Sequence, residues 1–171
     1  LRRPADPTCQ HPDLLFEADL PSPSRPEQTG SPDSLVDWAS LGRQGRRFVT
    51  GGPDAGALGS FFKTPLVAPI RVYVGLNSAD TPEARARLAL EELERVGAFE
   101  RSVMVLATPT GTGWIDPAGQ DPLEYLFRGD IATVAVQYSY LNSPLTLLTG
   151  GAYGAETARV LFVAIYDHWR G

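Results

Sequence analysis

The chain has 171 residues, of which 43% are hydrophobic, and it carries a formal net charge of −5. That length is enough for one domain with a sizeable core. The acidic balance argues against a general nucleic-acid surface, which needs clustered lysine and arginine. With one cysteine, Cys9, and two histidines, His11 and His168, the chain has no internal disulfide and too few ligands for a zinc site built from His and Cys. We therefore predict no nucleic-acid partner, no metal and no cofactor.

No segment of the sequence is long enough to span a bilayer. The longest fully apolar run covers residues 160–166, whereas a spanning helix needs about 20 apolar residues. The first residues, Leu1–Pro4, are not followed by the apolar region of a signal peptide. We expect a soluble segment, and because the chain does not begin with methionine we expect it to be a piece of a longer protein.

Residues 1–33 are predicted to form a proline-rich arm. Seven of the fifteen prolines lie at or before Pro32. Proline removes a backbone donor and fixes φ, which excludes a helix or a central strand here. We expect an extended arm that lies on the domain or is partly disordered, with Leu14–Phe16 as an apolar anchor.

Residues 34–69 carry weaker signals. Apolar residues between Leu35 and Leu41 predict one apolar turn, and residues 46–50 predict a short strand or an ordered loop. The glycines and prolines of residues 51–69 predict a loop.

The second predicted region covers residues 34–171. A regular α/β pattern begins within it at Ile70. Strands and helices alternate, which implies right-handed crossovers and a mostly parallel sheet between helical layers. We therefore predict an α/β fold of three layers, α/β/α. The predicted strands cover residues 70–76, 103–107 and 131–136, and the predicted helices cover residues 82–96, 123–127 and 155–170. Asp80 or Thr81 is expected to cap the first of these helices, and Gly97 to end it.

The loop after the strand at residues 103–107 is the candidate site. The strand is apolar on both faces, as expected of a buried parallel strand. Open α/β sheets place ligands outside the carboxyl ends of their strands, and glycines let another group approach backbone N–H donors closely. We interpret this loop as one wall of an active site, the alternative being a turn whose glycines serve only geometry. Its residues are Thr110, Gly111, Thr112, Gly113 and Trp114.

Two further expectations concern the same edge of the sheet. Gln137–Tyr140 follow the third strand and are predicted to reach the edge that carries the glycine loop. A complete catalytic triad is not predicted, because His168 falls at the opposite end of the sheet and His11 falls in the arm. The hydroxyl candidates near strand ends are Ser78, Thr112, Ser139 and Ser143, and the aspartates Asp80, Asp116 and Asp130 are expected to serve as caps and turns.

The run from Arg71 to Trp114, with the later stretches GDIATVAVQYSYLNSPLTLL and ETARVLFVAIYDHWRG, resembles the catalytic domain of a bacterial membrane-anchored α/β-hydrolase family. The resemblance covers about residues 34–171 and implies the amino-terminal part of that Rossmann-like fold. It places TPTGTGW at the oxyanion-loop position, so the backbone N–H groups of residues 110–114 are expected to supply one donor to the oxyanion. Thr112 is expected to add a hydroxyl donor, and Trp114 to exclude water.

The resemblance also implies what the chain lacks. The serine elbow G-x-S-x-G, the acidic residue and the histidine of the family would lie beyond Gly171, and no G-x-S-x-G occurs in this sequence. The implied function is part of a serine-type hydrolase acting on an ester, amide or lipid-like substrate. The implied partners are the remainder of the domain or a second chain, and a membrane reached through a segment outside this chain. The alternative is a non-catalytic α/β module that binds a ligand or protein at the same crevice.

Overall fold

A parallel sheet of three strands in the order β1-β3-β2 lies at the centre of the fold. The computed structural model describes residues 20–140 and 143–171, with the backbone alone for residues 143–151. The strands are β1 (Ile70–Val74), β2 (Val103–Ala107) and β3 (Ile131–Val136). Both pairings are parallel, and Tyr73, Ala135 and Ala107 share one row across the sheet. The predicted α/β class and parallel sheet are confirmed.

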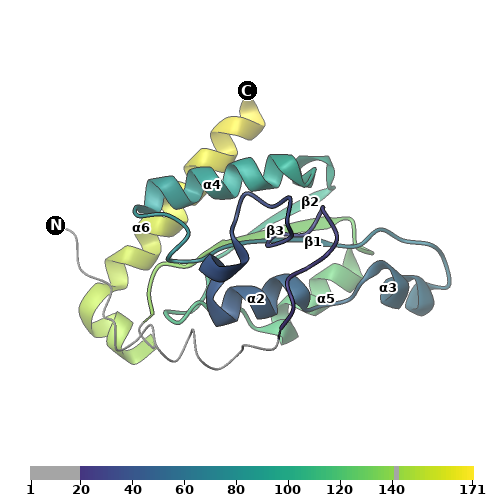
Figure 1. Cartoon of the computed structure of the whole chain (residues 1–171), viewed down its shortest axis with the longest axis horizontal. Coiled ribbons are helices and arrows are strands. Elements are labelled where there is room, and N and C mark those ends of the chain that lie inside the picture. The colour runs from purple at the N-terminus through teal and green to yellow at the C-terminus, as the bar shows by residue number, and fades with distance from the viewer. Residues whose placement is uncertain (1–19, 141–142) are drawn as a thin grey trace.

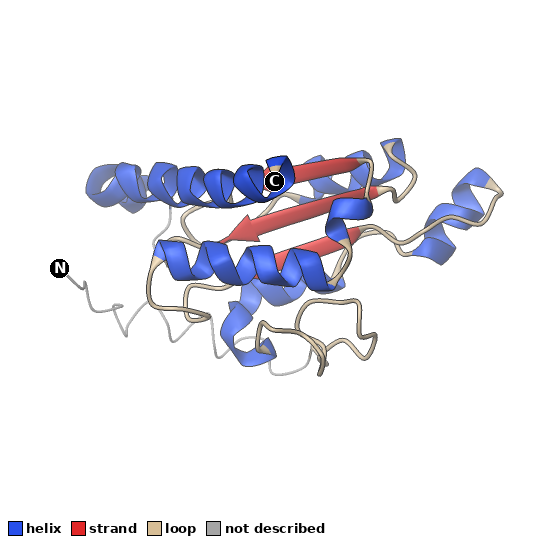
Figure 2. Ribbon diagram, turned by 90° about the horizontal axis from the view of Figure 1, so that it is seen from above, coloured by secondary structure: helices blue, strands red, loops and turns tan. Residues whose placement is uncertain are grey.

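Helices cover both faces of this sheet. On one face α4 (Pro82–Arg95) packs against α6 (Ser143–Arg170), and on the other lie α2 (Gly42–Thr50) and α5 (Pro117–Leu126) (Figure 1, Figure 2). Val72 and Tyr73 are neighbours on β1 and point to opposite faces, yet both are 0% exposed. The core is therefore double-sided, as a three-layer α/β/α arrangement requires.

The strand that the sequence predicts to be buried on both faces, β2, lies at the edge of the described sheet. Every residue of β2 is half-buried, whereas all six residues of β3 are buried. The difference arises because β3 pairs with a strand on each side and β2 pairs with β3 alone among the strands of the described region. The prediction that β2 is a buried strand is therefore wrong in the described structure, in which β3 is the central strand.

The helix ends follow local capping chemistry. The hydroxyl of Thr81 accepts from the amide of Ala84, so Thr81 and not Asp80 caps α4. Gly97 has a φ of 69° and ends the same helix, as predicted. Asp116 caps α5, which begins at Pro117 and continues through Pro122, so this helix is longer than the predicted residues 123–127.

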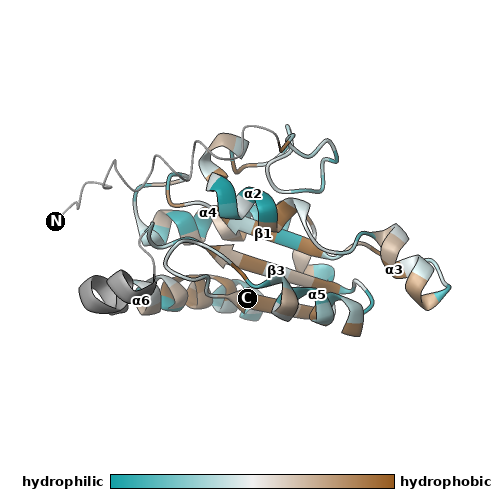
Figure 3. Cartoon of the chain, turned by 90° about the horizontal axis from the view of Figure 1, so that it is seen from below, coloured by the Kyte–Doolittle hydropathy of each residue, from teal (hydrophilic) through white to brown (hydrophobic). Residues whose placement is uncertain are grey.

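Two helices replace the strand and the loop predicted before β1. A 3-10 turn, η1 (Trp38–Leu41), leads into α2, and α3 (Ala55–Phe62) follows. Figure 3 shows α2 as largely hydrophilic, and only its apolar side, including Phe48 and Val49, is buried. Because so few of its residues are apolar, the sequence pattern does not predict this helix. In α3, the carboxylate of Asp54 accepts from the amide of Ala57 and caps the helix, although the four glycines and three prolines of residues 51–69 favour a loop.

The last helix is also longer than the prediction of residues 155–170. α6 spans Ser143–Arg170, so it begins well before residue 155. No helix in the described part of the chain is both long and apolar enough to cross a membrane, α6 included. The carboxyl-terminal half of α6 runs beside α4 (Figure 2).

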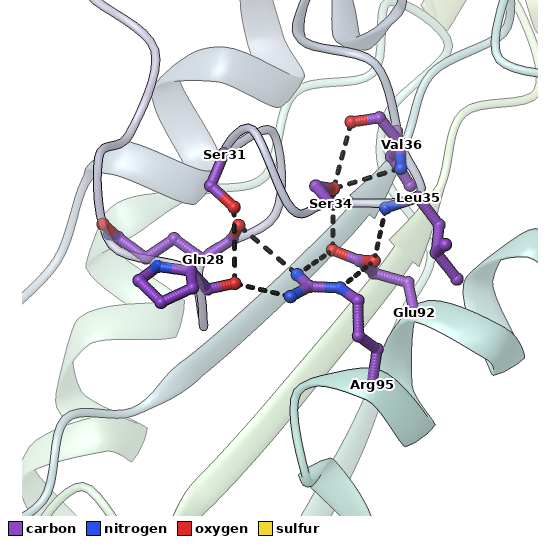
Figure 4. A network of polar contacts seen from close by, with 8 residues as sticks. Gln28, Ser31, Ser34, Leu35, Val36, Glu92 and Arg95 are labelled. Atoms are coloured by element: carbon purple, nitrogen blue, oxygen red, sulfur yellow. Dashed lines mark hydrogen bonds and ion pairs between the residues drawn. The ribbon is translucent and has the colours of Figure 1, made fainter.

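A buried carboxylate on α4 binds the segment that directly follows the arm. Glu92 is 0% exposed and accepts hydrogen bonds from the Ser34 hydroxyl, the Leu35 amide and the Arg95 guanidinium, at 2.7–3.0 Å (Figure 4). Arg95 also donates to two backbone carbonyl oxygens of the arm. Burial alone would raise the pKa of Glu92, but these hydrogen bonds outweigh it and hold the pKa below its ordinary value. The arm therefore contacts α4 through the carbonyl oxygens of Pro26 and Gln28, whereas the predicted anchor at residues 14–16 is outside the described residues.

A second ionic network joins β1 to α5. The side chain of Arg71 is 7% exposed and donates to Glu124 at 2.6 Å and to Asp121 at 2.7 Å. Glu124, with no exposed side-chain surface, also accepts from Gln120, whose amide reaches Thr133 on β3. The amino-terminal part of β1 is thus joined to α5 by a buried ion pair, Arg71–Glu124, and by a second pair with Asp121, whose side chain is 37% exposed.

Candidate active site

Three loops meet at the carboxyl edge of the sheet. They are residues 75–80 after β1, residues 108–116 after β2 and residues 137–140 after β3. Because the strands are parallel, these loops leave the sheet at one edge, as predicted for the glycine loop and for Gln137–Tyr140. This is the edge at which α/β sheets place their ligands.

The glycine loop closes on itself through Thr110. The Thr110 amide donates to the Trp114 carbonyl oxygen at 2.9 Å, and the Gly113 amide donates to the Thr110 carbonyl oxygen at 2.8 Å. The Trp114 amide donates to the Thr110 hydroxyl at 3.2 Å. Three of the amides proposed as oxyanion donors are therefore occupied within the loop. The amides of Gly111 and Thr112 make no hydrogen bond with any described residue, so they are the donors that remain.

Two buried side chains hold the loop by its carbonyl oxygens. The Tyr73 hydroxyl donates to the Gly113 carbonyl oxygen at 2.9 Å. The Gln137 side-chain amide donates to the Thr112 carbonyl oxygen at 3.3 Å and to the Ser139 carbonyl oxygen at 2.9 Å. Tyr73 is 0% exposed and Gln137 is 1% exposed.

Gly113 is the position at which the loop requires glycine. Its φ is +90°, a conformation that side chains disfavour. A Cβ there would lie 2.4 Å from the Tyr73 hydroxyl and 3.0 Å from the Gln137 side chain. The glycine thus allows the close approach by which Tyr73 and Gln137 reach the loop.

The other predicted contributors of the loop are placed differently. The Trp114 side chain is 42% exposed, so it does not close the site to water in the described structure. The Thr112 hydroxyl lies 3.2 Å from the Thr110 hydroxyl and is engaged within the loop. The predicted roles of these two side chains therefore have less geometric support than the predicted role of the backbone.

An apolar cavity of about 210 Å³ opens beside the start of the loop, between the ends of β2 and β3 and helix α6. It offers space for an apolar group next to the loop, with one threonine at the loop side. Its lining includes Leu106, Thr108, Val136, Tyr138, Leu161 and Phe162.

The described residues do not assemble a catalytic triad. The Ser78 hydroxyl lies 2.7 Å from the Ser40 hydroxyl. His168 lies near the end of α6, where its ring contacts Phe99 and its Nδ1 lies 3.2 Å from the Glu94 carboxylate. This is the amino end of the strands, as predicted. His11 and the side chain of Ser143 are outside the described residues.

Two of the aspartates near this region make structural hydrogen bonds. Asp116 caps α5, and Asp130 accepts from the amide and hydroxyl of Ser102, which lower the pKa of Asp130. Asp116 acts as a helix cap, as predicted, whereas the Asp130 carboxylate joins the segments that precede β2 and β3, which is a tertiary contact. Within residues 20–140 and 143–171, no group of three or more His, Cys, Asp and Glu side chains is arranged to hold a metal ion.

Tyr73 is the site residue that the sequence did not single out. The signal for it was present, because a tyrosine with a polar hydroxyl stands between two valines on a predicted buried strand. Gln137 carried a comparable signal, as a polar residue directly after six apolar or small strand residues.

The fold and the edge described above define a class, an α/β domain with a loop-built crevice at the carboxyl ends of parallel strands. Residues 70–171 match the sequence model of an α/β-hydrolase family, and residues 1–53 match the model of that family's N-terminus. The chain belongs to this α/β-hydrolase family. The match includes the proline-rich arm, which the resemblance by motifs did not cover. No curated protein and no solved structure matches the chain.

Proposed function

We propose that this chain forms the amino-terminal part of a serine-type hydrolase site, with residues 110–114 as the oxyanion loop. In acyl transfer through serine, attack of the hydroxyl oxygen on a carbonyl carbon places negative charge on the carbonyl oxygen. A preorganised N–H donor aimed at that oxygen contributes about 3–4 kcal/mol. The observation that carries the proposal is the pair of amides, Gly111 and Thr112, that have no hydrogen-bond partner among the described residues, in a loop fixed at the carboxyl edge of a hydrolase-family sheet.

The nucleophile, its acid and its histidine belong to residues outside this chain in the proposal. The substrate is an ester, amide or lipid-like molecule, and the apolar cavity beside Thr108 supports a substrate with an apolar group. Family membership supports the hydrolase assignment. Membrane attachment through a segment outside these residues, in a bacterial cell, is part of the same proposal and rests on the motif resemblance alone.

The remainder of the domain is proposed to lie against β2 and α6. Because α4 and α6 share one face, a right-handed crossover from β3 through α6 leads to a strand beyond β2. The apolar groove of about 310 Å³ beside β2, lined by Met104, Leu106 and aromatic side chains, supports this placement. Phe162 and Trp169 on α6 are 54% and 74% exposed, and such a face favours cover by the remainder of the domain or by a second chain.

A fluorophosphonate probe tests the proposed chemistry, because it forms a covalent bond only with an activated serine. We expect the full-length protein to be labelled at one serine outside residues 1–171, located by mass spectrometry of the digested protein. Heat-unfolded protein serves as the control. Absence of labelling would favour the alternative, a non-catalytic module that binds a ligand or partner at the same crevice.

A further inference from the structure

One buried amide connects the three loops of the crevice. The Gln137 side-chain oxygen accepts from the Leu76 amide after β1 at 3.3 Å, and its nitrogen donates to Thr112 after β2 and to Ser139 after β3. The Gln137 backbone amide continues the ladder by donating to Val74 at 2.9 Å. Gln137 is therefore held by the sheet and uses its whole amide group to fix the loops to one another.

Tyr73 reaches the same loop from two strands away. It shares a row with Ala135 on β3 and Ala107 on β2, and residues in one row of a parallel sheet point to the same face. The two small side chains leave room for a phenol ring to lie across the row. The Tyr73 hydroxyl thus meets Gly113, which folds back from the far edge of the described sheet.

These two anchors set the direction of the peptide groups between Thr112 and Trp114. A trans peptide points its N–H opposite to its C=O. Gln137 and Tyr73 hold the carbonyl oxygens of Thr112 and Gly113. The amides of the same two peptide groups, those of Gly113 and Trp114, therefore point away from the anchors and donate to Thr110. The two peptide groups between Thr112 and Trp114 are therefore fixed through both their carbonyl oxygens and their amides. The amides of Gly111 and Thr112 have no partner among the described residues.

We infer that Tyr73 and Gln137 are positioning residues that set the orientation of the oxyanion loop by binding its carbonyl oxygens. This inference rests on the proposed function for its catalytic consequence. A loop that serves only as a turn has no need of a buried tyrosine and a buried glutamine, each a polar group that is costly to bury without partners. A loop whose amides must meet a developing charge gains from such anchors, because donors fixed in advance need no reorganisation during the reaction.

The test compares Tyr73→Phe and Gln137→Met with the control Tyr125→Phe in the full-length protein. Tyr125 lies on α5 against Phe61, so the control removes the same hydroxyl group away from the crevice. Hydrogen–deuterium exchange follows residues 108–116, and p-nitrophenyl butyrate hydrolysis gives kcat and KM. Tyr73→Phe keeps the buried ring, so it remains informative if Gln137→Met does not fold.

We expect Tyr73→Phe to raise deuterium uptake in residues 108–116 and to lower kcat about tenfold. KM should change by less than about twofold, because a displaced oxyanion donor weakens binding of the transition state and not of the substrate. The control should change neither quantity. Unchanged uptake in both variants would overturn the inference.

The two hypotheses fail in different ways. If uptake rises while kcat stays constant, the anchors hold the loop but the loop is not the oxyanion donor, and the proposed function loses its central element. If the wild-type protein neither hydrolyses the ester nor reacts with a fluorophosphonate, the proposed function is wrong. The uptake measurement then still decides whether Tyr73 and Gln137 fix the loop.

Discussion

The contact of Ser34 and Leu35 with α4 gives a prediction whose size follows from the geometry at Glu92. The four hydrogen bonds to its carboxylate come from Ser34, Leu35 and, twice, Arg95. In Glu92→Gln one acceptor oxygen becomes an NH₂ group that faces two donors, so two of the four hydrogen bonds are lost. Hydrogen bonds to a charged group contribute about 1.5–3 kcal/mol each. At the lower end of that range, we expect a loss of about 3 kcal/mol in the free energy of unfolding.

For a protein of this size, 1 kcal/mol shifts Tm by about 2–4 °C, so the expected fall is about 6–12 °C. The control is Glu91→Gln, an exposed position on the same helix, which should change stability by less than about 0.5 kcal/mol. Urea unfolding measures the free energies, and hydrogen exchange at the Leu35 amide reports the contact itself. Equal stability of wild type and Glu92→Gln, with unchanged exchange at Leu35, would refute the reasoning.

The same carboxylate makes a prediction about pH. The pKa of Glu92 is lowered in the folded protein from its model-compound value of 4.5. Its contribution to stability is therefore fully present above about pH 4.5 and is lost as the pH falls through the lower, folded pKa. The difference in unfolding free energy between wild type and Glu92→Gln should shrink in this acid range. A constant difference from pH 7 to pH 2 would show that the charge of Glu92 does not cause the stabilisation.

The other predictions concern the second ionic network and the glycine loop. Arg71→Met leaves the carboxylate of Glu124 buried without its partner, and should cost about 3–5 kcal/mol in urea unfolding. The exposed Arg87→Met should change stability by less than about 0.5 kcal/mol, and equal losses would contradict a buried pair. Gly113→Ala should cost about 3 kcal/mol, from its φ of +90° and its contact with Tyr73. Gly119→Ala, in open space within α5, should gain about 0.5–1 kcal/mol, and a gain at both glycines would rule out the tight contact.

The sequence predicts well those elements whose ends and periodicity are local. The helix from Pro82 could be placed because Thr81, Pro82 and Gly97 act through neighbouring backbone groups. The strand at residues 131–136 could be placed because all its residues are apolar or small and all are buried.

Elements that depend on tertiary contacts were missed or misplaced. α2 is a helix because its apolar side packs on β1, and nothing in GRQGRRFVT alone gives that stripe enough residues. The edge position of β2 depends on strand order, which composition does not fix.

For the candidate site, too, the sequence predicts the part that depends on local signals and not the part that depends on tertiary contacts. The location of the loop followed from a strand and two glycines. Its anchoring by Tyr73 and Gln137 depends on side chains that are far apart in sequence and meet only through the register of the sheet. The sequence also does not predict that three loop amides are occupied by hydrogen bonds to Thr110 and Trp114, because turn hydrogen bonds depend on φ and ψ.

The most direct test of the account is a crystal structure of the full-length protein after reaction with a fluorophosphonate. The phosphonyl oxygen then occupies the place of the oxyanion. The account predicts a covalent bond to a serine outside residues 1–171, and the oxygen about 2.7–3.1 Å from the amide nitrogen of Gly111 or Thr112. An adduct whose oxygen is held by other groups, with the Thr110–Trp114 loop remote from it, would contradict the account.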